Sequence, residues 1–263
     1  MARCYLVLED GAVFDGLSFG AAPLRADDLP VGGADRGVGE VVFNTGMCGY
    51  HEMLTDPSCS GQVVVLTSPH AGNYGCSDEW SERGPDDSGL PEVKLAGFVV
   101  RSCYFGPLPP GRRTLDAYLR QHGVPGVWDA DTRAITTHLR ERGSCNGVVV
   151  RPSDGERLSE ADRAAVAAFF DSVPPMEGRN LLPTVGTRQT TVLSSNGAPR
   201  FVVVDCGVKR TILRELTLRG TALTLMPWSA SAEDILSAAP DGVLVSNGPG
   251  DPAVLTSVVD TIG

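Results

Sequence analysis

The sequence predicts an α/β protein with a β-rich first part and a parallel, doubly wound sheet in its last part. Short β-branched runs alternate with turn signals up to about residue 150, which is typical of a β-rich domain. From residue 201 onward apolar runs alternate with helical patterns, which favours a parallel sheet. Hydrophobic residues make up 42% of the 263 residues, enough for a packed core.

The first part opens with a hairpin signal. Asp10-Gly11 lies between apolar runs at residues 5–8 and 12–14, and an Asp-Gly pair favours the tight turn that joins antiparallel strands. Further β-branched runs predict strands at residues 40–43, 62–67 and 97–101, and a last apolar run at 147–150 closes this part. The stretch 77–92 is acidic and contains Gly and Pro, so we expect a solvated loop there.

Two helices are predicted between these strands. One follows Thr114 and stops at Gly123, and the other follows Asp131 and stops at Gly143. Thr and Asp side chains accept hydrogen bonds from the first free N–H groups of a helix. Gly takes the left-handed conformation in which helices often end. Each segment therefore has both a start and a stop signal.

Residues 153–199 are predicted to connect two domains and to contain one helix. Ser159 and Asp162 form a capping signal for an Ala-rich helix that extends to about residue 170. Prolines and polar residues follow, without a clear periodicity. We therefore expect one domain at residues 1–152 and another at 200–263.

The last part alternates strand, helix, strand, helix and strand. The predicted strands span residues 201–205, 222–226 and 242–246, and the predicted helices span 209–219 and 231–238. Continuous apolar runs with short connections are typical of parallel strands that are covered on both faces. We expect three strands before residue 263, so the sheet is incomplete and its last edge is uncovered.

The charge balance argues against several classes of partner. The chain has 22 Lys and Arg against 32 Asp and Glu, a net charge of −10, whereas nucleic-acid binders normally carry a basic face. No apolar run reaches the roughly 18 residues that a membrane span needs. Glu9 and Asp10 interrupt the short apolar strip near the start, so we expect no signal peptide. Neither nucleic acid nor a membrane is an expected partner.

The cysteines predict a reducing compartment. Their number is odd and their spacing wide, so we expect free thiols and a cytoplasmic location; they are Cys4, Cys48, Cys59, Cys76, Cys103, Cys145 and Cys206. No C-x-x-C pair occurs, so we expect no metal site. His138 shares a helical face with Ile135 and Leu139, which indicates a packed histidine. A Cys–His catalytic pair stays open, because such partners meet in space.

The turn at residues 247–251 is the first candidate functional feature. It follows the third predicted strand, and open parallel sheets bind ligands beyond the carboxyl ends of their strands. Gly248 and Gly250 permit a positive φ and let a ligand approach backbone N–H groups. A plain strand-to-helix turn, with Asp251 as N-cap and Pro252 at the first helical position, explains the same residues. No phosphate-loop pattern occurs.

Longer motifs resemble one known family, the small subunit of carbamoyl-phosphate synthase. Three segments are similar to its N-terminal domain: GEVVFNTGMCGYHEMLTDPS at 39–58, SPHAGNYG at 68–75 and DADTRAITTHLRERG at 129–143. A D-x-G-x-K-x-x-x-x-R pattern resembles the start of its triad-type glutamine amidotransferase domain, and consists of Asp205, Gly207, Lys209 and Arg214. The resemblance covers nearly the whole chain in the right order. It implies a flavodoxin-like arrangement for the last sheet.

The resemblance implies a glutamine-dependent reaction. In that family a Cys thiolate attacks the side-chain amide of L-glutamine, a His transfers protons and a Glu orients the His. The ammonia passes to a large synthetase subunit, which uses ATP and magnesium to make carbamoyl phosphate from bicarbonate. By this resemblance Ser58, Gly248 and Gly250 bind glutamine, and the Gly248 N–H forms part of the oxyanion hole. It also implies a heterodimer with the large subunit and no cofactor in this chain.

The catalytic residues of the family have no counterpart in residues 1–263. Its nucleophile lies in a G-x-C-x-G-H turn after the next strand, and its His and Glu lie farther on, so we expect this chain alone to be inactive. Cys206 lies at a strand-to-helix turn, but its position is not that of the family's nucleophile. Cys59 adjoins Ser58, and nothing in the sequence activates it.

Several alternatives stay open at the level of sequence. The chain could be a non-catalytic docking or regulatory relative that binds the large subunit, or a generic α/β ligand-binding domain. Whether it is a fragment or a natural truncation is also open. So is the question of whether the carbamoyl phosphate serves pyrimidine or arginine biosynthesis.

Overall fold

The structure, a computed structural model, describes residues 2–33, 36–85, 92–155 and 157–263. The chain divides into two compact units, which we name the barrel unit and the sheet unit. The barrel unit comprises Met1–Leu54, Gly61–Trp80 and Leu95–Met176, and the sheet unit comprises Thr55–Ser60, Ser81–Lys94 and Glu177–Gly263. Two short pieces of the N-terminal half therefore belong to the sheet unit. The domain bounds expected at residues 152 and 200 stay predictions.

The barrel unit is built on a closed sheet. Its strands are β1 (Arg3–Leu8), β2 (Val13–Gly20), β3 (Leu24–Arg25), β4 (Val38–Asn44), β5 (Gln62–Leu66), β6 (Gly97–Val100), β7 (Pro125–Trp128) and β8 (Cys145–Arg151). Seven of them follow the order β1-β2-β7-β6-β5-β4-β8, and β8 pairs again with β1, so the sheet closes on itself. The short β3 pairs with β8. The predicted hairpin is confirmed, since β1 and β2 pair antiparallel around Asp10-Gly11. The strands predicted at 40–43, 62–67 and 97–101 are confirmed as the parallel neighbours β4, β5 and β6.

Three of the four helices described in this unit begin where the sequence predicts, and the first was not predicted. Here α1 spans Tyr50–Thr55, α2 Leu115–Gln121, α3 Thr132–Arg142 and α4 Glu160–Phe170. The Thr114 and Asp131 side chains accept backbone N–H groups at the starts of α2 and α3, as their N-cap positions predict. Strand β1 alternates between two apolar clusters: Leu6 packs with α3 residues, and Tyr5 packs with α4 residues.

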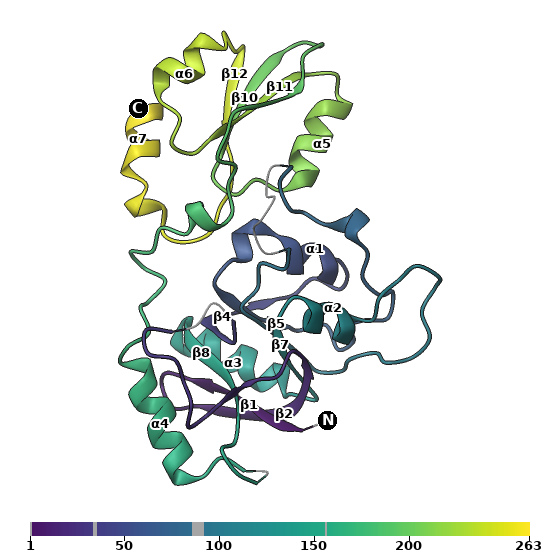
Figure 1. Ribbon diagram of the computed structural model, residues 1–263, viewed down its shortest axis with the longest axis vertical. Coiled ribbons are helices and arrows are strands. Elements are labelled where there is room, and N and C mark those ends of the chain that lie inside the picture. Colours follow the sequence, from purple (N-terminus) through teal and green to yellow (C-terminus); the bar gives the residue numbers. More distant parts are fainter. Residues whose placement is uncertain (1, 34–35, 86–91, 156) are drawn as a thin grey trace. The chain divides into compact units, whose positions relative to one another are not determined.

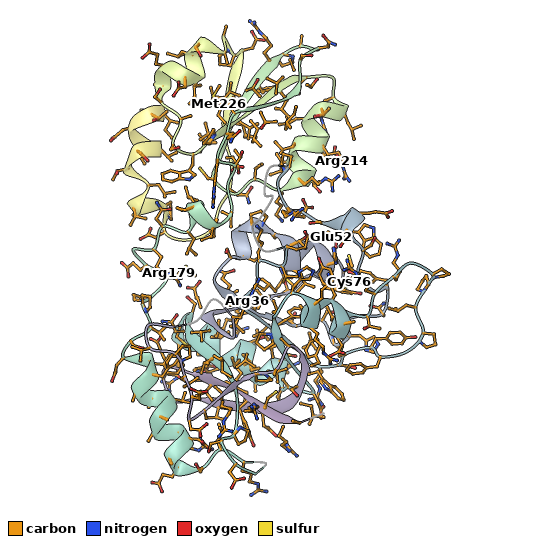
Figure 2. All side chains as sticks on the ribbon, viewed as in Figure 1. Arg36, Glu52, Cys76, Arg179, Arg214 and Met226 are labelled. Atoms are coloured by element: carbon orange, nitrogen blue, oxygen red, sulfur yellow. The ribbon has the colours of Figure 1, made fainter. Side chains whose placement is uncertain are left out.

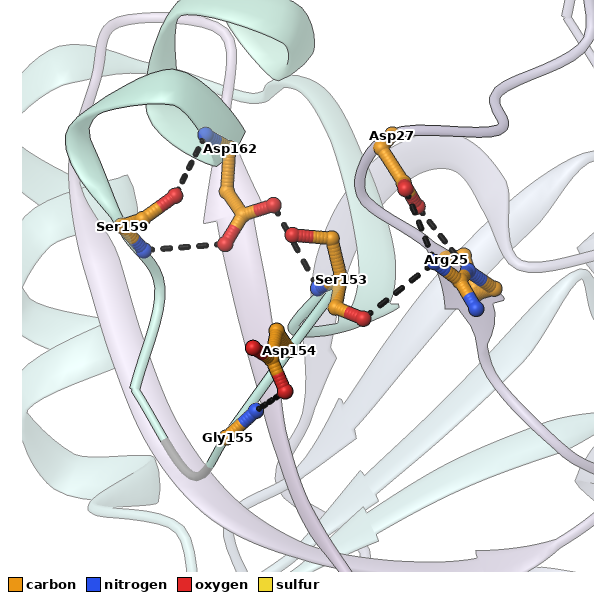
Figure 3. Close-up of polar contacts among 7 residues, drawn as sticks. All are labelled: Arg25, Asp27, Ser153, Asp154, Gly155, Ser159 and Asp162. Carbon is orange, nitrogen blue, oxygen red and sulfur yellow. Dashed lines mark hydrogen bonds and ion pairs between the residues drawn. The ribbon is translucent and has the colours of Figure 1, made fainter.

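The start of α4 is held by a capping box (Figure 3). The Ser159 hydroxyl accepts the Asp162 N–H at 3.0 Å, and the Asp162 carboxylate accepts the Ser159 N–H at 2.9 Å. The other Asp162 oxygen accepts the Ser153 N–H at 3.3 Å. Nearby, the Arg25 guanidinium pairs with Asp27 and donates to the Ser153 carbonyl at 3.2 Å. One buried carboxylate therefore ties the helix to the end of β8.

Removing the cap is expected to destabilise the barrel unit. Ser159→Ala leaves the Asp162 N–H without its acceptor, so the free energy of unfolding should fall by about 1 kcal/mol. Ser159→Asn serves as the matched control, since Asn also caps helices and should stay within a few tenths of a kcal/mol of wild type. Urea unfolding followed by circular dichroism measures both. Equal losses in the two variants would contradict a capping role.

The sheet unit contains four strands among its described residues. They are β9 (Thr191–Ser194), β10 (Arg200–Asp205), β11 (Ala222–Pro227) and β12 (Gly242–Val245), in the order β12-β10-β11-β9. The three predicted strands do pair in parallel, β10 with β11 and β10 with β12. The prediction of a three-stranded sheet is wrong, because β9 adds an antiparallel fourth strand beside β11. It comes from the polar stretch that the sequence assigned to the connection.

Helices cover both faces of this sheet (Figure 1). Helix α5 (Arg210–Leu218) packs Leu213 against one face, together with Val203. On the other face α6 (Ala232–Ser237) and α7 (Thr256–Ile262) pack with Val202 and with Met226, which Figure 2 labels. Val202 and Val203 are neighbours in β10 but pack on opposite faces of the sheet. Strand β10 is therefore buried on both sides, as its continuous apolar run predicts.

The last helix begins later than the sequence suggests. Asp251 caps a short 3₁₀ turn, Pro252–Val254, by accepting the Ala253 N–H at 2.8 Å. The backbone then leaves the helical conformation at Leu255 before α7 starts. The predicted cap is therefore correct, but the continuous helix from Pro252 is not.

Among the described residues, no helix is both long and apolar enough to cross a membrane.

Candidate functional site

The turn after β12 contains two glycines that no other residue could replace unless the surrounding backbone moved. A Cβ at Gly248 would lie 1.8 Å from the carbonyl oxygen of Cys206. Gly250 has φ +84°, and a Cβ there would lie 2.5 Å from the carbonyl oxygen of Arg179. Both contacts are far closer than atoms can approach. This goes beyond a plain strand-to-helix turn, in which a cap and a proline would suffice.

Hydrogen bonds hold this turn on both sides. The Ser246 hydroxyl accepts the Cys206 N–H at 2.9 Å. On the other side Asp251 donates its N–H to the Arg179 carbonyl at 3.1 Å and accepts the Gly178 N–H at 3.0 Å. Gly248 is an exposed residue, and within the described part of the chain its N–H has no acceptor. The turn is thus held firmly on both sides of a backbone donor that is not used within it.

The turn after β10 packs directly against Gly248. Gly207 has φ +112°, and a Cβ there would lie 3.3 Å from the Gly248 Cα. The buried Asp205 carboxylate accepts the Gly207 and Val208 N–H groups at 2.9 and 2.8 Å, and the Thr187 N–H at 2.8 Å. Because β10 and β12 are parallel neighbours, their carboxyl ends meet at one edge of the sheet. This edge is where open parallel sheets bind ligands.

Ser58 lies in a short 3₁₀ turn, Pro57–Cys59, of the sheet unit. Asp56 caps this turn: its Oδ1 accepts the Ser58 N–H at 2.9 Å and the Ser58 hydroxyl at 2.5 Å. Residue Asp56 is only 6% exposed. The Ser58 hydroxyl is therefore held by a buried carboxylate that the sequence did not single out.

Lys209 neutralises Asp56. Its Nζ lies 2.5 Å from Asp56 Oδ2. Burial acts to lower the pKa of Lys209, but the hydrogen bond and charge of Asp56, together with the charge of Glu82, outweigh burial and raise that pKa. The lysine is therefore charged at neutral pH. It connects the Ser58 turn to the segment that follows Gly207.

Glu82 anchors the start of α5 and so the backbone at Lys209. Lys209 occupies the N-cap position, but its side chain offers no oxygen to cap the helix. Glu82 instead accepts the Thr211 N–H at 2.8 Å and the Thr211 hydroxyl at 2.5 Å, and its carbonyl accepts the Arg210 N–H at 3.0 Å. Glu82 is 6% exposed, so the expectation of a solvated loop over 77–92 is wrong at this residue. Residues 86–91 of that stretch lie outside the described residues.

The predicted glutamine-binding residues all belong to the sheet unit. Gly248 and Gly250 lie in one turn, and Ser58 is linked through Asp56 to Lys209, two residues from Gly207. A shared ligand site for Ser58 and the two glycines stays a prediction. Arg214 of the D-x-G-x-K-x-x-x-x-R pattern lies on α5 with an exposed side chain (Figure 2) and takes no part in these contacts.

Neither cysteine near the turns is an activated nucleophile. Burial raises the pKa of Cys206 to about 11, and the charge of Asp205 adds to this effect. Burial and then the charge of Asp56 raise the pKa of Cys59 to about 12. Both thiols are therefore protonated at neutral pH, and the thiolate is the reactive form.

The other candidate groups remain structural. His138 lies half-buried on α3, where its Nε2 is 2.6 Å from Asp10 Oδ2, so it is bonded as well as packed. Over the described ranges, no cluster of His, Cys, Asp and Glu side chains has the arrangement of a metal site. A cavity of about 380 Å³ lies beyond β11, between residues that include Met226, Ser229 and Asp234, and none of the predicted binding residues lines it.

Comparisons with protein families match both parts of the chain. The family model described as "Carbamoyl-phosphate synthase small chain, CPSase domain" matches residues 6–149. The model described as "Glutamine amidotransferase class-I" matches residues 202–262. The second match contains the turns after β10 and β12, and the first contains the Ser58 turn.

Curated relatives agree with these matches. A carbamoyl phosphate synthase small chain of Methanopyrus kandleri is 41% identical over 99% of this chain and 66% of its own length. Those of Streptomyces avermitilis and Nitratidesulfovibrio vulgaris are 41% and 40% identical, over 94% and 99% of this chain and 60% and 67% of their own lengths. The chain thus spans about two thirds of the length of these relatives.

Proposed function

Because this chain belongs to the carbamoyl-phosphate synthase small-chain family, we propose that it is the glutamine-binding part of a glutamine-dependent carbamoyl-phosphate synthase. Its partner is a large synthetase subunit that takes ammonia, bicarbonate and ATP with magnesium and forms carbamoyl phosphate for pyrimidine or arginine biosynthesis. The assembly is a cytoplasmic heterodimer. The similarity to carbamoyl phosphate synthase small chains supports this proposal over a generic α/β ligand-binding domain.

The observation that carries the proposal is the Gly248 turn. The Gly248 N–H, which has no acceptor among the described residues, lies at the carboxyl edge of parallel strands. Contacts that tolerate no side chain hold it in place. When a thiolate adds to the amide carbon of glutamine, the carbonyl oxygen becomes an oxyanion, and the amide nitrogen then leaves as ammonia after protonation. A preorganised backbone donor stabilises that oxyanion. In this proposal Gly248 supplies one such donor, and Gly250 and Ser58 bind the rest of the substrate.

The nucleophile comes from elsewhere in this proposal. The protonated thiols of Cys59 and Cys206 do not supply it. The G-x-C-x-G-H segment of the family, which residues 1–263 do not contain, would supply the thiolate. This chain then binds and orients glutamine rather than attacking it.

A comparison of nitrogen sources tests the function. We define the assembled synthase as the complex between the protein that contains this sequence and its large subunit. This complex should form carbamoyl phosphate from L-glutamine and also from ammonium chloride. Synthesis from ammonium chloride alone, with none from L-glutamine, would favour the non-catalytic docking relative. A failure with both nitrogen sources would contradict any role in this synthase.

A further inference from the structure

We propose that Ser246 is a positioning residue that orients and polarises the peptide group carrying the Gly248 N–H. The inference rests on the proposed function, since it takes that N–H as an oxyanion donor. It goes beyond that function by identifying a side chain that acts on the donor from the opposite end of its peptide group.

The first step concerns the peptide group between Asn247 and Gly248. This peptide bond is trans, and a trans peptide group is planar, with its C=O and N–H pointing in opposite directions. The Gly248 N–H therefore points away from the Asn247 carbonyl oxygen. A contact that fixes the direction of this carbonyl also fixes the direction of the donor.

The second step is the contact that the Ser246 hydroxyl makes with this carbonyl. The hydroxyl donates its hydrogen to the Asn247 carbonyl oxygen at 2.8 Å. One of its lone pairs accepts the Cys206 N–H at 2.9 Å. Both directions are fixed by chemistry, because a carbonyl oxygen only accepts and a backbone N–H only donates. One hydroxyl therefore connects the turn after β10 to the peptide group of the donor.

The third step is the anchoring of Ser246 and of its neighbour. The Ser246 N–H donates to the Val204 carbonyl at 3.1 Å, which continues the pairing of β12 with β10. The Asn247 side-chain amide donates to the Gly207 carbonyl at 3.4 Å. The donor peptide group cannot rotate unless these contacts to β10 and its turn are broken. The donor is thus oriented before any ligand binds.

The fourth step is the effect on the strength of the donor. A hydrogen bond to the C=O of a peptide group withdraws electron density from its nitrogen, so the N–H becomes a stronger donor. The gain is largest for the most charged acceptor, which in this reaction is the oxyanion rather than the neutral amide oxygen of bound glutamine. Ser246 should therefore accelerate the chemical step more than it strengthens glutamine binding.

Single-turnover glutamate release by the assembled synthase separates these two effects. The synthase is held in excess over L-glutamine and its concentration is varied, so the saturating rate constant reports chemistry and the half-saturating concentration reports binding. Ser246→Ala should lower the rate constant about tenfold, because the hydrogen bond to the donor peptide group is lost. The half-saturating concentration should change less than about twofold.

Ser246→Thr tests whether the hydroxyl itself is responsible. Threonine keeps a hydroxyl on the same carbon, so its rate constant should stay within about twofold of wild type. Ser246→Cys provides a second test if the alanine variant does not fold. A thiol is only a weak donor, so this variant should still lose rate several-fold. Synthesis from ammonium chloride should keep its wild-type rate in all three variants.

Ser237→Ala is the matched control for the loss of a serine hydroxyl. The Ser237 hydroxyl donates to the Asp234 carbonyl at 2.7 Å, on α6 of the same unit and outside both turns. This variant loses the same kind of hydrogen bond but should keep the wild-type rate constant. A rate loss as large as that of Ser246→Ala would show that destabilisation of the unit explains the effect.

Three further results would overturn the proposal. In Ser246→Ala they are a rate constant within about twofold of wild type, or a raised half-saturating concentration at an unchanged rate constant. In Ser246→Thr it is a loss as large as that of the alanine variant. Wild-type synthase that uses ammonium chloride but no L-glutamine would instead refute the proposed function, so the two failures are distinguishable.

Discussion

Gly248→Ala is expected to lower glutamine-dependent carbamoyl phosphate synthesis by about a hundredfold or more, the usual effect of losing one oxyanion donor. The added methyl group would lie 1.8 Å from the Cys206 carbonyl oxygen, so the turn must move and its N–H with it. Synthesis from ammonium chloride should keep its wild-type rate, because that reaction bypasses glutamine. Rates from the two nitrogen sources, measured on the same preparation, give the result.

Gly220→Ala is the matched control for this variant. Gly220 belongs to the same unit and has φ +77°, but a Cβ there would meet no atom within 4 Å. Its substitution should cost about 1 kcal/mol of stability through backbone strain and should leave both rates unchanged. A loss of glutamine-dependent activity in the control as large as in Gly248→Ala would mean that general destabilisation, and not the turn, explains the effect.

Purified residues 1–263 are expected to release no glutamate from L-glutamine, with or without a large subunit. Amide hydrolysis at neutral pH needs an activated nucleophile with a base within hydrogen-bond reach. The thiols of Cys59 and Cys206 are protonated there, since their pKa values are about 12 and 11. Backbone donors alone leave about 10³–10⁴-fold catalysis over water in a protease without its triad, far below enzymatic rates.

The same assay identifies any nucleophile that this account has missed. Restoring a downstream segment with the G-x-C-x-G-H cysteine should produce turnover. Turnover by residues 1–263 that Cys206→Ala abolishes would instead make Cys206 the nucleophile. Turnover that survives both Cys59→Ala and Cys206→Ala would show a different group at work.

Local signals in the sequence predicted the starts of helices well. Thr114, Asp131 and Ser159 all cap the helices that they were expected to cap. A cap depends on a side chain and N–H groups only two or three residues away, so the sequence contains the whole interaction. The Asp10-Gly11 hairpin was predictable for the same reason.

Strands that depend on their neighbours were missed. β7 begins with Pro125-Gly126 and shows no alternation, yet it pairs with both β2 and β6. β9 lies in a polar stretch and is stabilised by pairing with β11, because an edge strand needs little apolar surface of its own. Pairing partners far away in the chain determined both strands, and no local pattern records them.

The candidate site was predictable only in part. Gly248 and Gly250 stood out in the sequence because a glycine between a strand and a helix indicates a positive φ or a close backbone contact. The structure shows close contacts at both glycines, which leave no room for a side chain. Asp56 and Glu82 were not recognised, since their partners Lys209 and Thr211 follow more than a hundred residues later. An acidic residue in a polar stretch looks solvated until its distant partner is known.

The most direct measurement is a crystal structure of this protein with L-glutamine bound. The account predicts that the Ser58 hydroxyl and the Gly248 N–H each lie about 3 Å from the same glutamine molecule. Ser58 more than about 15 Å from Gly248, several times any hydrogen-bond distance, would contradict the shared site and with it the assignment of these residues to glutamine.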